Sequence, residues 1–179
     1  MLRKSDKGFY SFFPSVVCVI VTSFQGRTNA MPAAWTTISS INPRYFSVMI
    51  SKRRFTYELL SRSKSFSVNF LDWKHLDIVD KLGFYSGRDV DKIEKFNIPL
   101  ERGILDGVFY IPLSFAVYEC KLVKDEEVGD HNLIVGEVMN VLVDDDVFDS
   151  SGNYIPDKVS PILYVAGEGY IKLRILRDF

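Results

Sequence analysis

HNLIVGEVMNVLVD, residues 131–144, is the stretch that decides the fold of this chain. Both of its alternating faces are largely apolar, with Leu133 and Met139 on one face and Ile134 and Val138 on the other. Because side chains alternate across a strand, such a strand must be covered on both sides. A closed β-barrel covers the inner face, and a second copy of the chain is one cover for the outer face. We therefore expect a barrel strand here, and a homodimer.

The rest of the chain shows mostly strand patterns with a few short helical patterns between them. Strands are predicted at 15–24, 29–37, 44–51, 65–71 and 113–128, and short helices at 55–63, 74–84 and 89–96. The steady strand–helix alternation of a parallel α/β sheet is missing. No linker or repeat divides residues 1–179. We expect one mainly β domain, a small antiparallel barrel with short helices inserted, because a closed barrel leaves few exposed edges.

Composition excludes several classes of function. The net charge of −1 offers no basic face for nucleic acid. No apolar run reaches the ~20 residues needed to cross a membrane, and Pro14 interrupts the start before a secretory core forms, so a cytoplasmic protein is expected. The two histidines and two cysteines are scattered singly, without metal-ligand spacing. Cys18 and Cys120 lie in apolar runs, which favours buried thiols, with a disulfide as the alternative.

Motifs of common catalytic sites are also missing. No G-x-G-x-x-G follows a strand, and neither a Walker-type glycine loop nor a G-x-S-x-G elbow is present. These absences exclude a Rossmann dinucleotide domain, a phosphate-loop nucleotidase and an α/β-hydrolase, and a bound cofactor would have to be held by other means.

The stretch NAMPAAWTT, residues 29–37, has two small residues where a strand would favour branched ones. The adjacent Ala33 and Ala34 would let a flat ring reach the backbone, while Trp35 would provide an aromatic wall. The alternative is a tightly packed strand whose alanines face bulky neighbours.

The stretch SKRRFT, residues 51–56, joins a predicted strand to a predicted helix. Three basic residues between Ser51 and Thr56 suit a phosphate, which accepts hydrogen bonds from hydroxyls and from helix N-terminal amides. The alternative is a solvated basic turn in which Ser51 or Thr56 caps the helix.

Two further loops carry polar groups at the ends of predicted elements. In YSGRDVDK, residues 85–92, Ser86 and Gly87 offer exposed backbone while Arg88 and Lys92 offer positive charge. The alternative there is a capped helical turn. The Gly129-Asp130 turn then brings His131 to the start of the predicted strand at 131–144; the alternative is an ordinary surface histidine.

Taken together and in this order, these stretches resemble the flavin reductase-like family of FMN-binding split-barrel proteins, which includes flavoredoxin-type proteins and ferric reductases. The resemblance runs from about residue 10 to about residue 170. Its matching elements are N-A-M-x-A-A-W-T (29–36), SSINP (39–43), RFT (54–56), F-x-V-N (66–69), S-G-R-D-V-D-K (86–92), G-D-H-x-L-x-V-G-E-V (129–138) and P-x-L-Y (161–164).

The resemblance implies a split barrel of the Greek-key type and a set of residues around bound FMN. Those implied at the flavin ring and ribityl chain are Asn29, Ala30, Met31, Ala33, Trp35 and Thr36. Those implied at the phosphate are Ser51, Lys52, Arg54 and Thr56, with Lys92 from the second loop. Ser86 and Gly87 of that loop are also implied in cofactor binding. His131 is implied near the polar end of the flavin and Tyr164 at its border. Which of Arg53 and Arg54 meets the phosphate stays open.

The function implied is that of an FMN-binding oxidoreductase in which the flavin carries the chemistry and no side chain is catalytic. It would accept hydride from NAD(P)H and pass electrons to free flavin, ferric iron or a redox protein. The alternative is a flavoredoxin-type electron carrier that a partner protein reduces. A third hypothesis, a small barrel without a cofactor, leaves the basic turn merely solvated.

Overall fold

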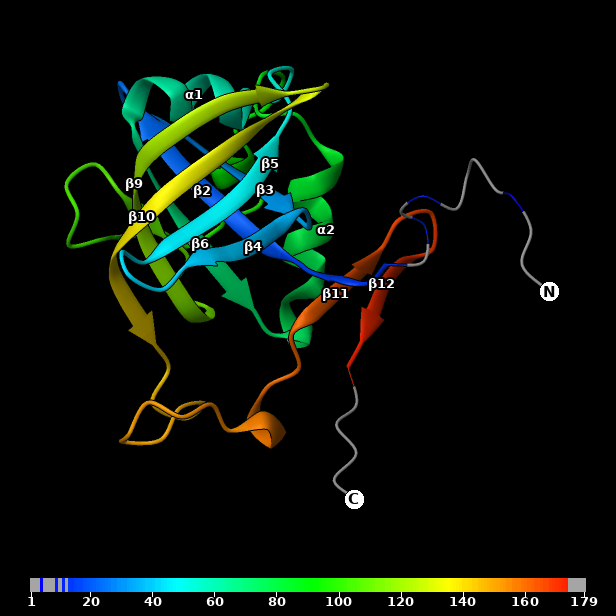
Figure 1. The fold of residues 1–179 in the computed structure, drawn as a ribbon, viewed down its shortest axis with the longest axis vertical. Coiled ribbons are helices and arrows are strands. Elements are labelled where there is room, and N and C mark those ends of the chain that lie inside the picture. The colour runs from blue at the N-terminus through cyan, green and yellow to red at the C-terminus, as the bar shows by residue number, and fades with distance from the viewer. Residues whose placement is uncertain (1–3, 5–8, 10, 12, 174–179) are drawn as a thin grey trace.

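The structure is a computed structural model that describes residues 4, 9, 11 and 13–173 (Figure 1). Strands dominate these residues, with three α-helices and two short 3-10 turns between them. The elements are β1 (Ser15–Val16), β2 (Cys18–Phe24), β3 (Arg27–Ala33), β4 (Thr36–Ser40), β5 (Tyr45–Ile50), α1 (Phe55–Ser63), β6 (Ser65–Leu71), η1 (Trp73–His75), α2 (Leu76–Phe84), α3 (Lys92–Lys95), β7 (Glu101–Arg102), β8 (Phe109–Tyr110), β9 (Ser114–Val128), β10 (His131–Val143), η2 (Pro156–Lys158), β11 (Ile162–Val165) and β12 (Gly169–Lys172).

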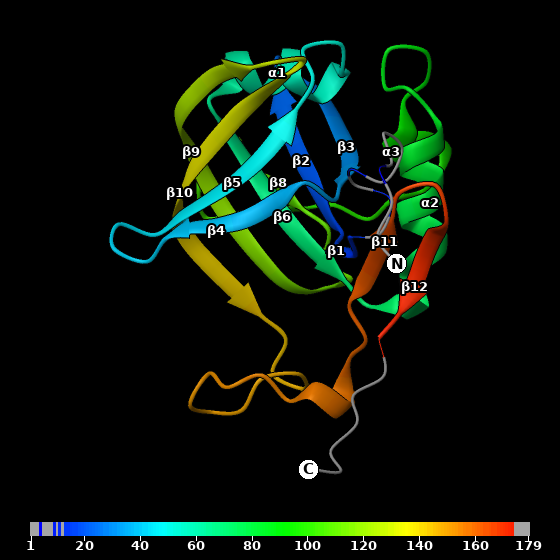
Figure 2. The same ribbon diagram turned by 45° about the vertical axis from the view of Figure 1, so that its right-hand side comes forward.

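Seven strands form one antiparallel sheet in the order β3-β2-β6-β9-β10-β5-β4. The β9–β10 hairpin is inserted between β5 and β6, and the sheet curls into a barrel (Figure 2). The two edge strands, β3 and β4, are consecutive in the chain and separated only by Ala34 and Trp35. The barrel is therefore split where this short connection passes from one edge of the sheet to the other.

The prediction of a single strand at 29–37 is wrong, because the chain forms two strands there, β3 and β4. At the break the Trp35 carbonyl accepts a hydrogen bond from the Met49 amide at 2.9 Å, which ties the connection to β5. The change of direction follows from barrel closure, since one straight strand cannot lie on both edges of the same sheet.

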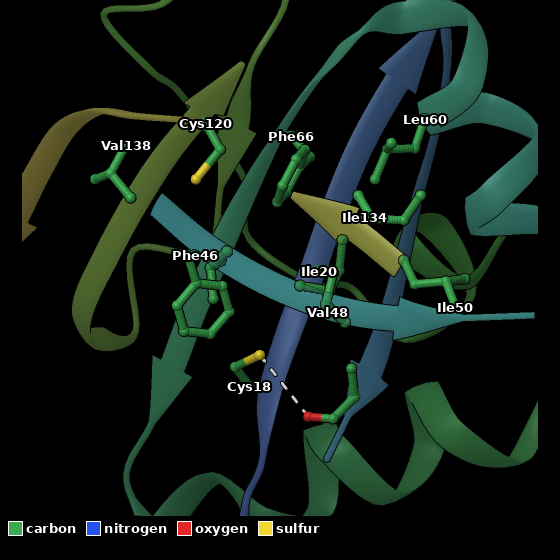
Figure 3. Packing of buried hydrophobic residues seen from close by; sticks show 12 residues of the cluster. Cys18, Ile20, Phe46, Val48, Ile50, Leu60, Phe66, Cys120, Ile134 and Val138 are labelled. Carbon is green, nitrogen blue, oxygen red and sulfur yellow. Dashed lines mark hydrogen bonds between the residues drawn. The ribbon is translucent and has the colours of Figure 1, made fainter. Parts of the chain in front are cut away.

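The barrel interior is apolar and contains both cysteines (Figure 3). Helix α1 closes one end of the barrel, with Leu60 packed into the core. Cys18 and Cys120 are fully buried and unpaired, and burial raises the pKa of the Cys18 thiol to about 12. The expectation of buried, reduced thiols is confirmed. The remaining members of this core are Ile20, Ala33, Phe46, Val48, Ile50, Phe66, Val68, Ile134 and Val138.

A second apolar layer lies between the barrel and helices α2 and α3. Val19 and Val21 of β2 and Ala30 of β3 face it, and Val79 and Leu82 of α2 pack on them. The small sheet β1-β11-β12 lies beside α2 (Figure 2). This layer fixes the end of α2, and the loop after it, next to the split in the barrel.

Strand β10 has the two-faced burial that its sequence predicts. Ile134 and Val138 point into the barrel, whereas Met139, Val141 and Val143 on the outer face are 43%, 38% and 43% exposed. The barrel strand is confirmed, and its outer face stays open to solvent in the single chain. Among the described residues no helix is long and apolar enough to cross a membrane.

Candidate functional site

Two adjoining cavities lie at the split in the barrel. The larger has a volume of about 620 Å³ and the smaller about 150 Å³. Met31, Arg54, Gly83 and Phe84 line both, so the cavities form one continuous site. A larger cavity joined to a smaller one has room for a ring system that carries a compact group on a tail.

The connection between β3 and β4 forms one wall of the larger cavity. Ala33 and Ala34 line it with methyl groups, and the Trp35 ring lies 4.9 Å from the His131 ring at a tilt of 41°. His131 Nδ1 is 2.8 Å from a carboxylate oxygen of Asp130, and this hydrogen bond lowers the pKa of Asp130. The ionised carboxylate accepts from Nδ1–H, which orients the imidazole in the cavity wall.

The opposite wall comes from α2 and from the small sheet. Tyr164 of β11 and Tyr170 of β12 form a tilted pair with ring centroids 5.4 Å apart. Burial raises the pKa of Tyr170, and the nearby charge of Asp80 on α2 adds to this shift. The larger cavity is therefore mostly aromatic and apolar, with one histidine and a few charged groups at its edge.

The smaller cavity lies at the N-terminus of α1. Arg54 is the N-cap residue, and no side chain caps the helix. The alternative in which Ser51 or Thr56 caps α1 is therefore wrong: Thr56 is buried, and its hydroxyl accepts a hydrogen bond from Asn29 Nδ2 at 2.8 Å. An uncapped N-terminus leaves first-turn amides and the positive end of the helix dipole available to an anion.

Lys92 places a buried positive charge at this cavity. Its side chain is 97% buried (3% exposed), and its Nζ donates to the Leu82 carbonyl at 2.9 Å. Burial and the nearby Arg54 charge lower the pKa of Lys92 to about 8. It forms no ion pair with a carboxylate among the residues that the structure describes. A buried cation without a counter-ion indicates a chamber built for an anion.

Gly87 allows the loop between α2 and α3 to approach this chamber. A Cβ at Gly87 would lie 2.2 Å from Asn29 Oδ1 and 2.8 Å from Phe55 Cδ1. Only glycine fits this close contact, which brings β3, α1 and the loop together around the smaller cavity.

Most residues that the sequence predicts for the site line these cavities. Arg53 lines the smaller cavity and Arg54 lines both, so the two arginines both lie at the smaller cavity. The other predicted residues found in the walls are Asn29, Met31, Ala33, Trp35, Ser51, Thr56, Ser86, Gly87, Lys92, His131 and Tyr164.

Three predicted residues lie elsewhere. Ala30 is buried in the layer between β3 and the helices, and Thr36 starts β4 without lining either cavity. Lys52 is half exposed and forms an ion pair with Glu127, which raises the Lys52 pKa. The short-range pattern SKRR could not reveal this partner, because Glu127 belongs to the distant strand β9.

Sequence reasoning missed the contribution of α2. Asp80, Gly83 and Phe84 all line the larger cavity. Their spacing of three and four residues places them on one face of the helix. That spacing, ending in a glycine and an aromatic residue just before the S-G-R-D loop, is the signal that could have found them.

The fold is that of a split-barrel protein with two joined cavities at the split. Residues 9–170 match the family model described as "Flavin reductase like domain". The chain therefore belongs to the flavin reductase like domain family, and the resemblance noted in its sequence is confirmed.

Solved structures agree with this assignment. An FMN-binding protein from Thermus thermophilus with bound 1-cyclohex-2-enone is 34% identical, with a TM-score of 0.83 over 96% of this chain and 93% of that one. The flavoredoxin of Desulfovibrio vulgaris (Miyazaki F) has a TM-score of 0.88 over 98% of this chain and 95% of that one, at 24% identity.

A relative from Aeropyrum pernix is 32% identical over 154 residues. The match covers 86% of this chain but only 58% of the relative, so this chain spans little more than half of that protein's length.

Proposed function

We propose that this chain binds FMN, with the flavin ring in the larger cavity and the phosphate in the smaller one. The observation that carries this proposal is Lys92, a buried cation without a carboxylate partner that lines a chamber too small for a ring. The larger cavity, at about 620 Å³, lies within the range of about 300–1,000 Å³ usual for cofactor sites. The uncapped N-terminus of α1 adds a second feature that favours a phosphate.

The residues of the chain fit this group. Arg54 and Lys92 would neutralise the phosphate, and the Ala33-Ala34 backbone would lie against the ring. Bound FMN would supply electron and hydride transfer at its ring, while the protein supplies orientation and electrostatics. His131, held by Asp130, would present its remaining ring nitrogen to the polar edge of the flavin.

The activity that we propose is reduction of the bound FMN by NAD(P)H, followed by transfer of electrons from the FMN to free flavin, to ferric iron or to a redox protein. Membership of the flavin reductase like domain family supports it. The test is to mix the FMN-loaded protein with NADH or NADPH under anaerobic conditions and to follow the flavin absorbance. Rapid bleaching with either nucleotide is expected. If neither bleaches the flavin while a chemical reductant does, the reductase proposal fails and the protein is instead an electron carrier.

We also propose a homodimer, built on the outer face of the barrel. Ile38 and Ile41 are 64% and 84% exposed, and they border an apolar groove of about 260 Å³ that Val141 also lines. An exposed apolar surface of this kind commonly marks a protein–protein contact. Light scattering of the purified protein should give twice the 20.5 kDa chain mass, whereas Ile41→Asp should give the mass of one chain.

We also propose a cytoplasmic location, which the two unpaired thiols support.

The proposed phosphate site predicts how FMN affinity depends on pH. Lys92 has a pKa of about 8 in the unliganded protein, and a bound phosphate stabilises its charged form and raises that pKa. FMN should therefore bind most tightly below pH 8. Affinity should fall by up to about tenfold per pH unit above it, until the raised pKa is reached. Titrations at pH 7, 8, 9 and 9.5 measure this. Riboflavin, which has no phosphate, should show no such fall, and a similar fall for both flavins would contradict the assignment to Lys92.

A further inference from the structure

Arg88 joins the two walls of the smaller cavity without entering it. One wall is the turn Arg53–Thr56 at the start of α1, and the other is the loop with Ser86 and Gly87. Arg88 Nη1 donates to the Arg53 carbonyl at 2.6 Å, and its Nη2 donates to Glu58 Oε2 at 3.1 Å. Arg88 is not among the residues that line either cavity. Its guanidinium instead contacts the α1 side, at the Arg53 carbonyl and Glu58.

A second arginine reinforces the same connection. Arg27 of β3 donates to the Gly87 carbonyl at 3.4 Å, and its guanidinium lies 4.5 Å from the centre of the Phe55 ring. The Arg88 guanidinium lies 5.7 Å from the centre of that ring. The guanidinium groups of Arg27 and Arg88 therefore both lie near Phe55, the first residue of α1. Arg88 belongs to the loop, and Arg27 donates a hydrogen bond to it. Cation–π contacts of this kind add to the hydrogen bonds.

The loop itself is shaped to present Arg88. The Arg88 amide donates to Ser86 Oγ at 3.2 Å, and the amides of Asp89 and Val90 donate to the Ser86 carbonyl at 3.1 and 3.2 Å. These local bonds define a compact turn with Arg88 on its outside. Its planar guanidinium can bridge two acceptors at once, whereas the point charge of a lysine cannot hold both in this geometry.

We propose that Arg88 is a positioning residue: it latches the loop onto the start of α1 and so slows the release of a ligand phosphate held between them. This inference rests on the proposed FMN site. The two walls line the smaller cavity together, so their separation would loosen the contacts that hold a phosphate between them. Breaking the latch should therefore raise the dissociation rate of a phosphorylated ligand.

A simpler explanation is that Arg88 attracts the phosphate through its charge alone. The two explanations predict opposite effects on FMN binding when the Glu58 carboxylate is removed. Removing the Glu58 carboxylate takes away a negative charge near the cavity, so simple attraction would tighten FMN binding. Under the latch, the same change removes one of the two acceptors of Arg88 and speeds release.

The experiment measures FMN dissociation by stopped flow, with riboflavin as a second probe. We expect Arg88→Ala to speed FMN release about tenfold and Glu58→Ala about threefold, in line with the loss of charged hydrogen bonds. Arg88→Lys keeps the charge and should behave like Arg88→Ala. Riboflavin release should change less than about twofold in each variant, because riboflavin has no phosphate. A merely destabilised fold would affect both flavins alike.

The matched control is the ion pair between Lys81 and Asp77 on α2. It has the same 3.1 Å separation and a similar exposure, and it lines neither cavity. Lys81→Ala should leave the release of both flavins unchanged. The latch is overturned if Glu58→Ala slows FMN release or if Arg88→Lys behaves like the wild type. If neither flavin binds the wild type at all, the proposed function fails first.

Discussion

Replacing Lys92 with Met is expected to weaken FMN binding by about 1.5–3 kcal/mol at pH 7, which is tenfold to more than a hundredfold in the dissociation constant. Lys92 lines the smaller cavity, is almost fully buried and has no carboxylate partner among the described residues. A charge-assisted contact in such surroundings is poorly screened by water. The measurement is a titration of the unliganded protein with FMN, followed by quenching of flavin fluorescence.

The matched control is Lys52, a second lysine that the sequence placed at the phosphate. Its side chain is exposed and paired with Glu127, and it lines neither cavity. Lys52→Met should change FMN affinity by no more than about twofold, because an exposed ion pair contributes little. Riboflavin should bind the wild type and the Lys92 variant alike. Equal losses at Lys52 and Lys92 would show that the phosphate is held elsewhere.

The same lysine links binding to the stability of the fold. The lowering of its pKa from 10.5 to about 8 means that burial, together with the nearby Arg54 charge, disfavours the charged form in the folded chain. This cost is fully present below pH 8, where the folded and unfolded chains both carry the proton, and it fades as the pH rises toward 10.5. A bound phosphate offsets it at neutral pH. FMN should thus raise the melting temperature more than riboflavin does at equal free ligand concentration, because the ligand that binds more tightly stabilises the fold more.

The strands were predictable because alternation is a local property of the sequence. β2, β5, β6, β9 and β10 lie where their patterns place them, to within one to three residues at each end. The break at Ala34 and Trp35 was not predictable in this way, since both residues are compatible with a strand. It arises where the two edges of the barrel meet, and that meeting depends on pairing between β10 and β5, far apart in the chain.

The candidate site, too, was predictable where its signal is local in the sequence and not where it depends on contacts between distant segments. A run of basic residues next to a helix start predicts a phosphate site, and the smaller cavity lies at that point of the chain. Which cation faces the chamber is decided by tertiary neighbours: Glu127 draws Lys52 away, and the packing of α3 brings Lys92 in. The sequence showed only that Arg88 offers a positive charge in its loop, and its contacts with Glu58 and the Arg53 carbonyl could be seen only in the folded chain.

Gly136 is the position in β10 where one added methyl group should damage the barrel most. A Cβ there would lie 2.5 Å from Phe66 Cζ and 2.9 Å from Cys120 Cβ. Both neighbours are fully buried in the barrel core, where Figure 3 shows Phe66 among its apolar neighbours. The pairing of β10 with β9 shifts register between Val135 and Gly136, so the backbone is already irregular at this point.

Gly136→Ala is therefore expected to lower the free energy of unfolding by about 1–3 kcal/mol, the usual cost of overpacking. Urea denaturation of the wild type and the variant measures it. The cause can be isolated with Phe66→Leu, which shortens the side chain that the new methyl group would strike. Alone, Phe66→Leu should also destabilise the barrel, because it leaves a cavity. Combined with Gly136→Ala, the loss should be smaller than the sum of the two by about 1 kcal/mol, since contacting residues are not additive. Strictly additive losses would mean that the methyl group disturbs the β9–β10 pairing instead of the ring, and would place the constraint in the backbone of β10.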